Sequence, residues 1–165
     1  MPSDPCIRIE PATPSDVGLI LSFVRELAAY ERLSGEVMAT EEDLHDALFG
    51  PRPVIETLIA RLNDEPVGFA LFFVNFSTFS GQRGLYLEDL FVRPEARRLG
   101  VGRRLLTALA RLARDRGYGR LEWSVLDWNE PALRFYADLG ARPKEEWTTH
   151  RLAGESLTRL ADEME

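Results

Sequence analysis

Cysteine is almost absent from the sequence, and long apolar runs are missing altogether. Cys6 is the single cysteine among 165 residues, so no internal disulfide can form, as is usual in a reducing compartment. The longest apolar run lies near residues 69–74, whereas a membrane helix needs about 20 apolar residues. Residues 1–5 contain neither the basic nor the apolar region of a signal peptide. We therefore expect a cytoplasmic protein that does not enter a membrane.

Basic side chains are fewer than acidic ones, and this difference limits the partners that the protein can bind. The chain has 27 acidic against 20 basic side chains, a formal net charge of −7. An acidic surface argues against nonspecific binding to nucleic acid and mildly favours cationic partners. His45 and His150 are isolated and lack metal-ligand spacing with acidic or cysteine residues, so we expect no bound metal.

The pattern of apolar residues predicts one α/β domain over residues 1–165, and 45% hydrophobic content is normal for such a domain. We expect strands at residues 7–10, 54–62, 67–75, 85–92, 121–126 and 147–152, and helices at 16–32, 41–49, 101–117, 129–140 and after 153. Residues 121–126 are apolar at four of six positions, and we interpret them as a strand covered on both faces. Because the middle strands follow one another without helices, a sandwich around a mixed sheet is favoured over a doubly wound parallel fold.

A glycine-containing loop is expected between the strand at 85–92 and the helix that follows it. Its sequence is Arg97-Arg98-Leu99-Gly100-Val101-Gly102, and N–H groups at such a helix start can converge on an anion. Arg103-Arg104 stands where a nucleoside triphosphate loop places Lys and Ser or Thr, and the third glycine of a dinucleotide fingerprint is missing. A plain structural turn and a site for the pyrophosphate of coenzyme A both remain open.

Several motifs resemble one family of enzymes. Arg97-x-x-Gly100-x-Gly102 resembles the acyl-CoA signature of GNAT acetyltransferases, and Leu90-Phe91-Val92-x-Pro94 resembles the strand before that signature. A closer resemblance is to the diamine acetyltransferases, the spermidine/spermine and thialysine group. The stretches that carry it, up to about Arg142, are Arg8-Ile9-Glu10-Pro11-Ala12-Thr13, Glu26-Leu27-Ala28, Tyr30-Glu31, Tyr86-Leu87-Glu88-Asp89-Leu90-Phe91-Val92, Trp128-Asn129-Glu130-Pro131, Phe135-Tyr136 and Gly140-Ala141.

The resemblance implies a GNAT-like α/β fold, with a mixed, mostly antiparallel central sheet and helices on both faces. It also implies acetyl-CoA as co-substrate, a small-molecule amine as acceptor, and a homodimer whose active sites draw on both subunits. The cofactor-binding residues expected from it are Leu90, Phe91, Val92, Arg97, Arg98, Leu99, Gly100, Val101, Gly102, Arg103, Asn129, Pro131 and Ala132. The expected substrate-binding residues are Tyr30, Glu31, Glu88, Glu122, Trp123 and Ser124.

Acetyl transfer to an amine requires proton removal, because an alkylammonium with a pKa of about 10.4 is not a nucleophile at neutral pH. Glu88 and Asp89 are adjacent on a predicted strand, so only one of them should face a given cleft. The resemblance places the ammonium on the face that Glu88 would share with Tyr86 and Leu90, which makes Glu88 the candidate base, directly or through water. In the resembling family, a tyrosine at the position of Tyr136 protonates the departing thiolate. The alternatives are a structural ion pair for Glu88 and a core position for Tyr136.

The sequence departs from polyamine-specific members of the family near the expected amine site. Ser34 and Gly35 stand where those members tend to carry acidic residues, so a long polycation would lose ion pairs. A shorter amine, such as a thialysine-like amino acid or a diamine, is favoured. Two other functions remain open, a GNAT enzyme that acetylates a protein amine and a catalytically silent acyl-CoA-binding module. Glu31 and Glu88 suit a compact cation, and the presence of Glu88 and Tyr136 favours an active enzyme.

Overall fold

A computed structural model describes residues 5–163 of the chain. Its internal contacts divide the chain into two compact units, one that ends at Leu126 and one that begins at Asp127. The first unit holds the sheet and three α-helices, and the second holds two α-helices, as far as the described residues extend.

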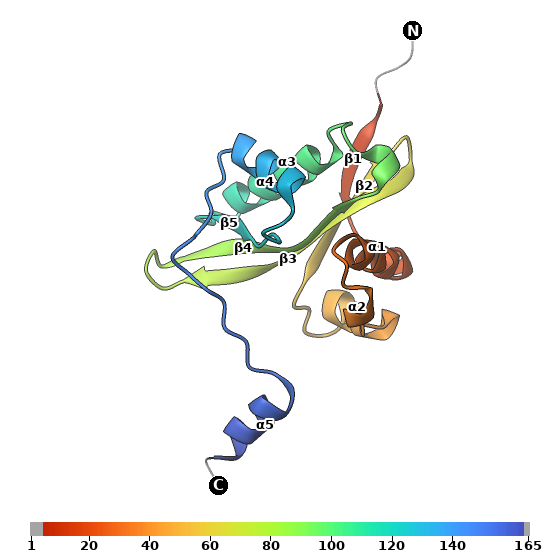
Figure 1. The fold of residues 1–165 in the computed structure, drawn as a ribbon. Helices are drawn as coiled ribbons and strands as arrows, with labels where there is room; N and C mark the ends of the chain where they lie inside the picture. The colour runs from red at the N-terminus through yellow and green to blue at the C-terminus, as the bar shows by residue number, and fades with distance from the viewer. Residues whose placement is uncertain (1–4, 164–165) are drawn as a thin grey trace. The chain divides into compact units, whose positions relative to one another are not determined.

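The strands of the first unit form one sheet among the described residues, and they follow one another across it in chain order (Figure 1). They are β1 (Ile7–Pro11), β2 (Glu56–Leu62), β3 (Glu65–Ser77), β4 (Gln82–Val92) and β5 (Leu121–Trp123). Neighbouring strands from β1 to β4 are antiparallel, and β5 runs parallel to β4. The prediction of a mixed, mostly antiparallel sheet is confirmed.

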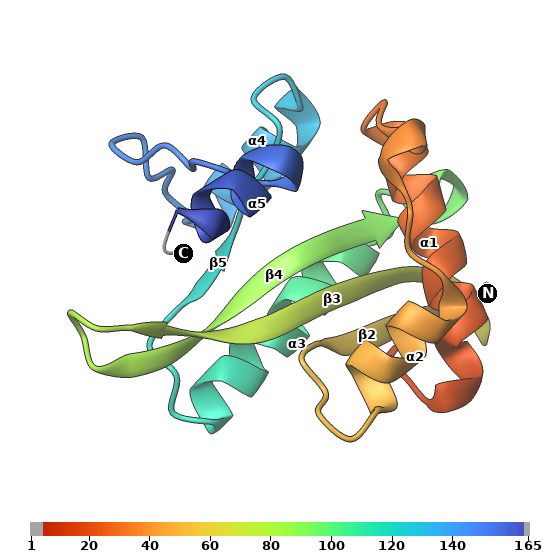
Figure 2. The same ribbon diagram turned by 90° about the horizontal axis from the view of Figure 1, so that it is seen from below.

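Helices cover both faces of this sheet, as the two views in Figures 1 and 2 show. The helices α1 (Val17–Tyr30) and α2 (Glu41–Phe49) lie on one face, and α3 (Val101–Asp115) lies on the other. Short 3-10 turns span Pro14–Asp16, Ser34–Glu36 and Pro94–Ala96. The prediction of helices on both faces is therefore confirmed.

Each face of the sheet has its own apolar layer. Under α1, the fully buried ring of Phe23 stacks on Phe69 of β3, with 5.3 Å between ring centroids. On the opposite face, α3 presents a buried stripe at helical spacing, consisting of Val101, Leu105, Leu106, Leu109 and Ala113. These two layers hold α1 and α3 against opposite faces of the same sheet.

Two predicted strands differ from the structure. The strand expected at residues 121–126 covers only Leu121–Trp123, and it is half-buried rather than covered on both faces. It lies at the edge of the sheet and pairs only with β4 among the described strands, so its apolar run does not indicate a central position. Residues 147–152 form no strand, and Trp147 is 74% exposed. Alternating apolar residues become a strand only where a neighbouring strand and a buried face exist.

The second unit contains α4 (Glu130–Asp138) and α5 (Gly154–Asp162), both of which agree with the predicted helices. The carbonyl of Asn129 accepts the N–H of Leu133 at 3.0 Å, so Asn129 stands at the start of α4. Among residues 5–163, none of the helices combines the length and the apolar content that a membrane span requires.

The stacked pair beneath α1 predicts a large loss of stability when one ring is removed. Phe23→Ala should lower the free energy of unfolding by about 3 to 5 kcal/mol, because the cavity cannot be filled by the surrounding side chains. Urea denaturation followed by circular dichroism measures this loss. Phe79→Ala is the matched control, since Phe79 is fully exposed, and it should change stability by less than about 0.5 kcal/mol. Equal stability of the two variants would contradict the assignment of this core.

Candidate active site

The loop with the signature motif connects β4 to α3 within the first unit. It follows the 3-10 turn Pro94–Ala96 and ends where α3 begins at Val101. Gly100 caps the helix with a φ of 86°, a left-handed conformation that favours glycine, and a Cβ built there would meet nothing within 4 Å. The backbone beside Gly100 is therefore open to an approaching group. Because the first-turn N–H groups of a helix lack intrahelical partners, they can bind a phosphate at this opening.

The end of β4 extends beyond its parallel neighbour. The ladder between β4 and β5 ends at the pair Leu87 and Trp123, whereas β3 accompanies β4 as far as Val92. Residues 88–92 are thus fixed along one edge and lie beyond the β5 ladder along the other. An extended ligand could bind backbone groups along that second edge. The predicted pantetheine-binding residues lie in this segment, namely Leu90, Phe91 and Val92.

A β-bulge in β4 places Glu88. Leu71 of β3 pairs with Asp89, and the next residue, Phe72, pairs with Leu87, so Glu88 is an extra residue in β4. A bulge bends the strand and re-aims the side chains beside it. The two-residue alternation that underlies the predicted shared face of Glu88, Tyr86, Leu90 and Val92 is therefore interrupted. Glu88 is exposed, and Asp89 is half-buried.

Three carboxyl groups interact around this bulge. Burial, the charge of Glu88 and the charge of Glu31 together raise the pKa of Asp89 to about 7. Burial also raises the pKa of Glu31, which follows the last residue of α1. The end of α1 and the middle of β4 thus concentrate negative charge in one place, as the binding of a cation requires. Asp89 was not among the predicted site residues, and only its place beside Glu88 in the sequence could have indicated it.

Two predicted substrate-binding residues have partners at the junction of β4 and β5. Glu122 accepts a hydrogen bond from Asn75 at 3.4 Å and forms a salt bridge with Arg120 at 2.9 Å. The hydroxyl groups of Ser124 and Tyr86 are 2.7 Å apart. These contacts tie the edge strand to its neighbours, and substrate binding by Glu122 and Ser124 stays a prediction. The third predicted residue of this stretch, Trp123, is half-buried at the end of β5.

The side chain of Arg97, the first residue of the signature motif, contacts the end of β4 and the end of α1. Its Nε donates to the carbonyl of Val92 at 2.9 Å. Its guanidinium lies 4.9 Å from the ring centroid of Tyr30 and 5.6 Å from that of Phe91. The side chain therefore contacts the end of β4 and the last residue of α1. Of the other predicted loop residues, Arg98 and Leu99 are exposed, and Val101, Gly102 and Arg103 form the first turn of α3.

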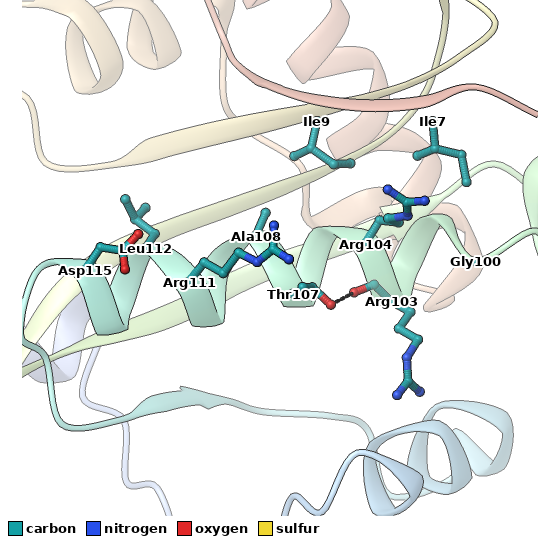
Figure 3. Close-up of a pocket in the computed structure, with 10 residues that line it drawn as sticks. All are labelled: Ile7, Ile9, Gly100, Arg103, Arg104, Thr107, Ala108, Arg111, Leu112 and Asp115. Atoms are coloured by element: carbon teal, nitrogen blue, oxygen red, sulfur yellow. Dashed lines mark hydrogen bonds between the residues drawn. The ribbon is translucent and has the colours of Figure 1, made fainter.

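A groove of about 700 Å³ runs between α3 and β1 (Figure 3). Arg104 and Arg111 of α3 line it together with Ile7 and Ile9 of β1, and the side chain of Arg103 points away from Arg104. None of the three carboxyl groups near the bulge lines this groove. The groove is therefore separate from the predicted amine-binding residues of the first unit.

The remaining predicted residues belong to the second unit. Asn129 is buried at the start of α4, and Pro131 occupies its first turn, followed by Ala132. Tyr136 lies in the last part of α4, where its ring centroid is 5.6 Å from that of Phe135. Within residues 5–163, no group of three or more histidine, cysteine or acidic side chains could hold a metal ion.

Comparison with known proteins identifies the family. Residues 22–141 match the Acetyltransferase (GNAT) family. The chain is 38% identical over 166 residues to a thialysine N-epsilon-acetyltransferase of Bos taurus, covering 94% of this chain and 97% of the relative. It is 36% identical over 198 residues to an L-ornithine N5-acetyltransferase of Arabidopsis thaliana, covering 93% and 87%. An integron cassette protein from the mobile metagenome of V. cholerae has a similar structure, with a TM-score of 0.78, 28% identity and coverage of 94% and 97%.

The chain therefore belongs to the GNAT family of acetyltransferases, and it is an acyl-CoA-dependent N-acetyltransferase. The resemblance to the thialysine and spermidine/spermine group is confirmed by the thialysine relative. A spermidine/spermine N(1)-acetyltransferase-like protein of Homo sapiens is also 31% identical across 93% of this chain and 24% of its own length.

The raised pKa of Asp89 predicts that stability depends on pH. The carboxyl has an ordinary pKa of 3.8 in the unfolded chain and a pKa of about 7 in the folded protein. Between these values the folded state holds the extra proton, so the free energy of unfolding decreases as the pH rises. Asp89→Asn should therefore stabilise the protein at pH 8, by roughly 1 to 3 kcal/mol, and by less than half as much at pH 5.

Denaturation by urea at both pH values measures this difference between Asp89→Asn and the unchanged protein. An equal effect of the substitution at pH 5 and pH 8 would contradict the raised pKa, because only a titrating group makes the effect depend on pH.

Proposed function

We propose that the enzyme transfers the acetyl group of acetyl-CoA to a primary amine of a small molecule, namely a thialysine-like amino acid, a diamine or a polyamine, with preference for the shorter amines. The observation that carries this proposal is the concentration of Glu31, Glu88 and Asp89 around the bulge in β4. An ammonium group would relieve the repulsion among these carboxylates. Relatives named for thialysine and for L-ornithine support an amino acid with a side-chain amine as the acceptor.

Backbone groups of the first unit form most of the proposed acetyl-CoA site. The open backbone at Gly100 and the first turn of α3 fit a pyrophosphate, which needs N–H donors at close range. Backbone groups of residues 90–92 would receive the extended pantetheine arm beside the end of β5. By resemblance, Asn129, Pro131 and Ala132 at the start of α4 complete the cofactor contacts.

In the proposed reaction, Glu88 removes a proton from the substrate ammonium, directly or through water. The freed amine attacks the thioester carbon, so that a C–N bond forms and the C–S bond breaks. Tyr136 donates its phenol proton to the departing thiolate; a phenol has an ordinary pKa of about 10 and a thiol one of about 8.5. The nitrogen loses its second proton as the amide forms, and this proton restores the phenol of Tyr136, while Glu88 releases the first proton to solvent. An N–H group of residues 90–92 would stabilise the charge that develops on the carbonyl oxygen. Glu31 and the ionised form of Asp89 would hold the ammonium in place by their negative charge.

A panel of amines with acetyl-CoA tests the choice of substrate, with release of CoA as the readout. Thialysine, lysine, ornithine and putrescine represent short amines, and spermine represents a long polycation. We expect kcat/KM for the best short amine to exceed that for spermine by at least about tenfold, since each lost ion pair at a partly buried site costs about 1 kcal/mol or more. A lysine-containing peptide serves as the control for a protein substrate. Activity confined to that peptide would contradict the proposal.

Substitution of the two proposed catalytic residues should affect the rate in different ways. Glu88→Gln keeps the size of the side chain but removes the proton acceptor, so kcat should fall by about 10²- to 10⁴-fold at neutral pH. The loss should shrink as rising pH deprotonates the free amine. Tyr136→Phe removes only the proton donor, so its loss should persist at high pH and should shrink with an acyl donor whose thiol is more acidic.

Steady-state kinetics from pH 6 to pH 10 separate the two effects, and circular dichroism checks that both variants fold. Turnover near that of the unchanged enzyme in both folded variants would exclude these roles. In that case positioning of the amine and the thioester would have to supply the rate.

A further inference from the structure

We propose that Arg97 is a positioning residue, whose side chain links the acyl-CoA loop to Tyr30 at the amine site and does not bind the phosphate groups. This inference rests on the proposed function, because it assigns Tyr30 to amine binding. The backbone and the side chain of Arg97 thus have different roles. The backbone belongs to the signature loop, whereas the guanidinium contacts other elements.

The side chain of Arg97 folds back over the end of the sheet. Its Nε–H binds the carbonyl of Val92 at 2.9 Å, which fixes the guanidinium beside the last residue of β4. The planar group then lies over the ring of Tyr30 at 4.9 Å and near the ring of Phe91 at 5.6 Å. A guanidinium can stack on aromatic rings and donate a hydrogen bond at the same time. One side chain thus contacts the loop, the strand and the helix end.

Tyr30 is the place where this contact reaches the amine site. It is the last residue of α1, and it directly precedes Glu31, whose charge acts on Asp89 across the gap to β4. A shift of the loop at Arg97 would therefore be felt at the ring of Tyr30 and at the adjacent carboxyl group. Binding of acetyl-CoA to the loop and binding of the amine are expected to be coupled through this contact.

A second arginine explains why removing Arg97 should not displace the whole helix. Arg93 forms hydrogen bonds with both carboxyl oxygens of Glu26, at 3.1 and 3.3 Å from Nε, and its guanidinium lies 4.7 Å from the centroid of Phe23. It also donates to the carbonyl of Pro66 at 2.9 Å. The body of α1 is therefore held to β4 independently of Arg97. Removal of Arg97 would therefore act on the end of the helix at Tyr30 rather than on its body.

The first experiment compares Arg97→Ala with two controls by calorimetry and steady-state kinetics. In Arg97→Ala, the Kd for CoA should stay within about threefold, while the KM for the best amine at saturating acetyl-CoA should rise roughly 5- to 20-fold. Gly100→Val should instead raise the Kd for CoA at least about tenfold, because it introduces a Cβ and strain at a φ of 86°. Arg111→Ala removes a positive charge farther along α3 and should change neither quantity.

A double substitution tests whether Tyr30 is the partner. Tyr30→Leu alone should raise the amine KM, and Arg97→Ala added to it should raise the KM by less than about twofold more, since the contact has already been removed. Arg97→Lys keeps the charge but loses the planar group, so it should restore only part of the amine affinity. Fully additive effects of the two substitutions would overturn the link to Tyr30.

Hydrogen exchange provides a readout that needs no amine substrate. Saturating CoA should slow amide exchange over residues 27–33 in the unchanged enzyme, and this slowing should be lost in Arg97→Ala. Equal slowing in both proteins, or a tenfold weaker affinity of Arg97→Ala for CoA with an unchanged amine KM, would overturn the inference. If no amine is acetylated, the proposed function fails, and the exchange experiment still decides whether Arg97 links the loop to Tyr30.

Discussion

The short parallel ladder between β4 and β5 is the constraint on which the candidate site depends. Three residue pairs join the two strands, and the last pair is Leu87 with Trp123. Because β3 pairs with β4 as far as Val92, the end of β4 keeps its position without support from β5. The hydrogen bond between Tyr86 and Ser124 and the contacts of Glu122 secure the last paired residues. A longer β5 would occupy the backbone edge that an extended ligand needs.

The bulge at Glu88 lies where that ladder stops, and it determines the electrostatics of the site. In a regular strand, adjacent carboxyl groups point to opposite faces and interact weakly. Here burial, together with the charges of Glu88 and Glu31, raises the pKa of Asp89 to about 7. Such a cluster destabilises the protein on its own, and a bound cation offsets that cost. Repulsion among the three carboxylates thus favours the binding of a substrate that carries a positive charge.

Elements that depend on local sequence patterns could be predicted, whereas features that depend on pairing between distant strands could not. The helices α1 to α4, the strands β1 to β4 and the loop at Gly100 follow from periodicity and turn residues, which act over a few positions. The length of β5 and the irregular segment 147–152 depend on the presence of a neighbouring strand, and no local pattern encodes that. The bulge is equally invisible, because nothing in residues 85–92 indicates an extra residue until the register with β3 is known. Asp89 was missed for this reason.

The arginines of residues 93–120 show why a cluster in sequence does not amount to one binding surface. Arg93 binds a carboxylate of α1, Arg116 binds Glu56 of β2, and Arg120 binds Glu122 of β5. Arg104 and Arg111 line a groove beside β1. The segment crosses from one end of the sheet to the other, so its positive charges serve several elements. Within the signature motif, the backbone at Gly100 is open to an approaching group, whereas the side chain of Arg97 contacts the ends of β4 and α1.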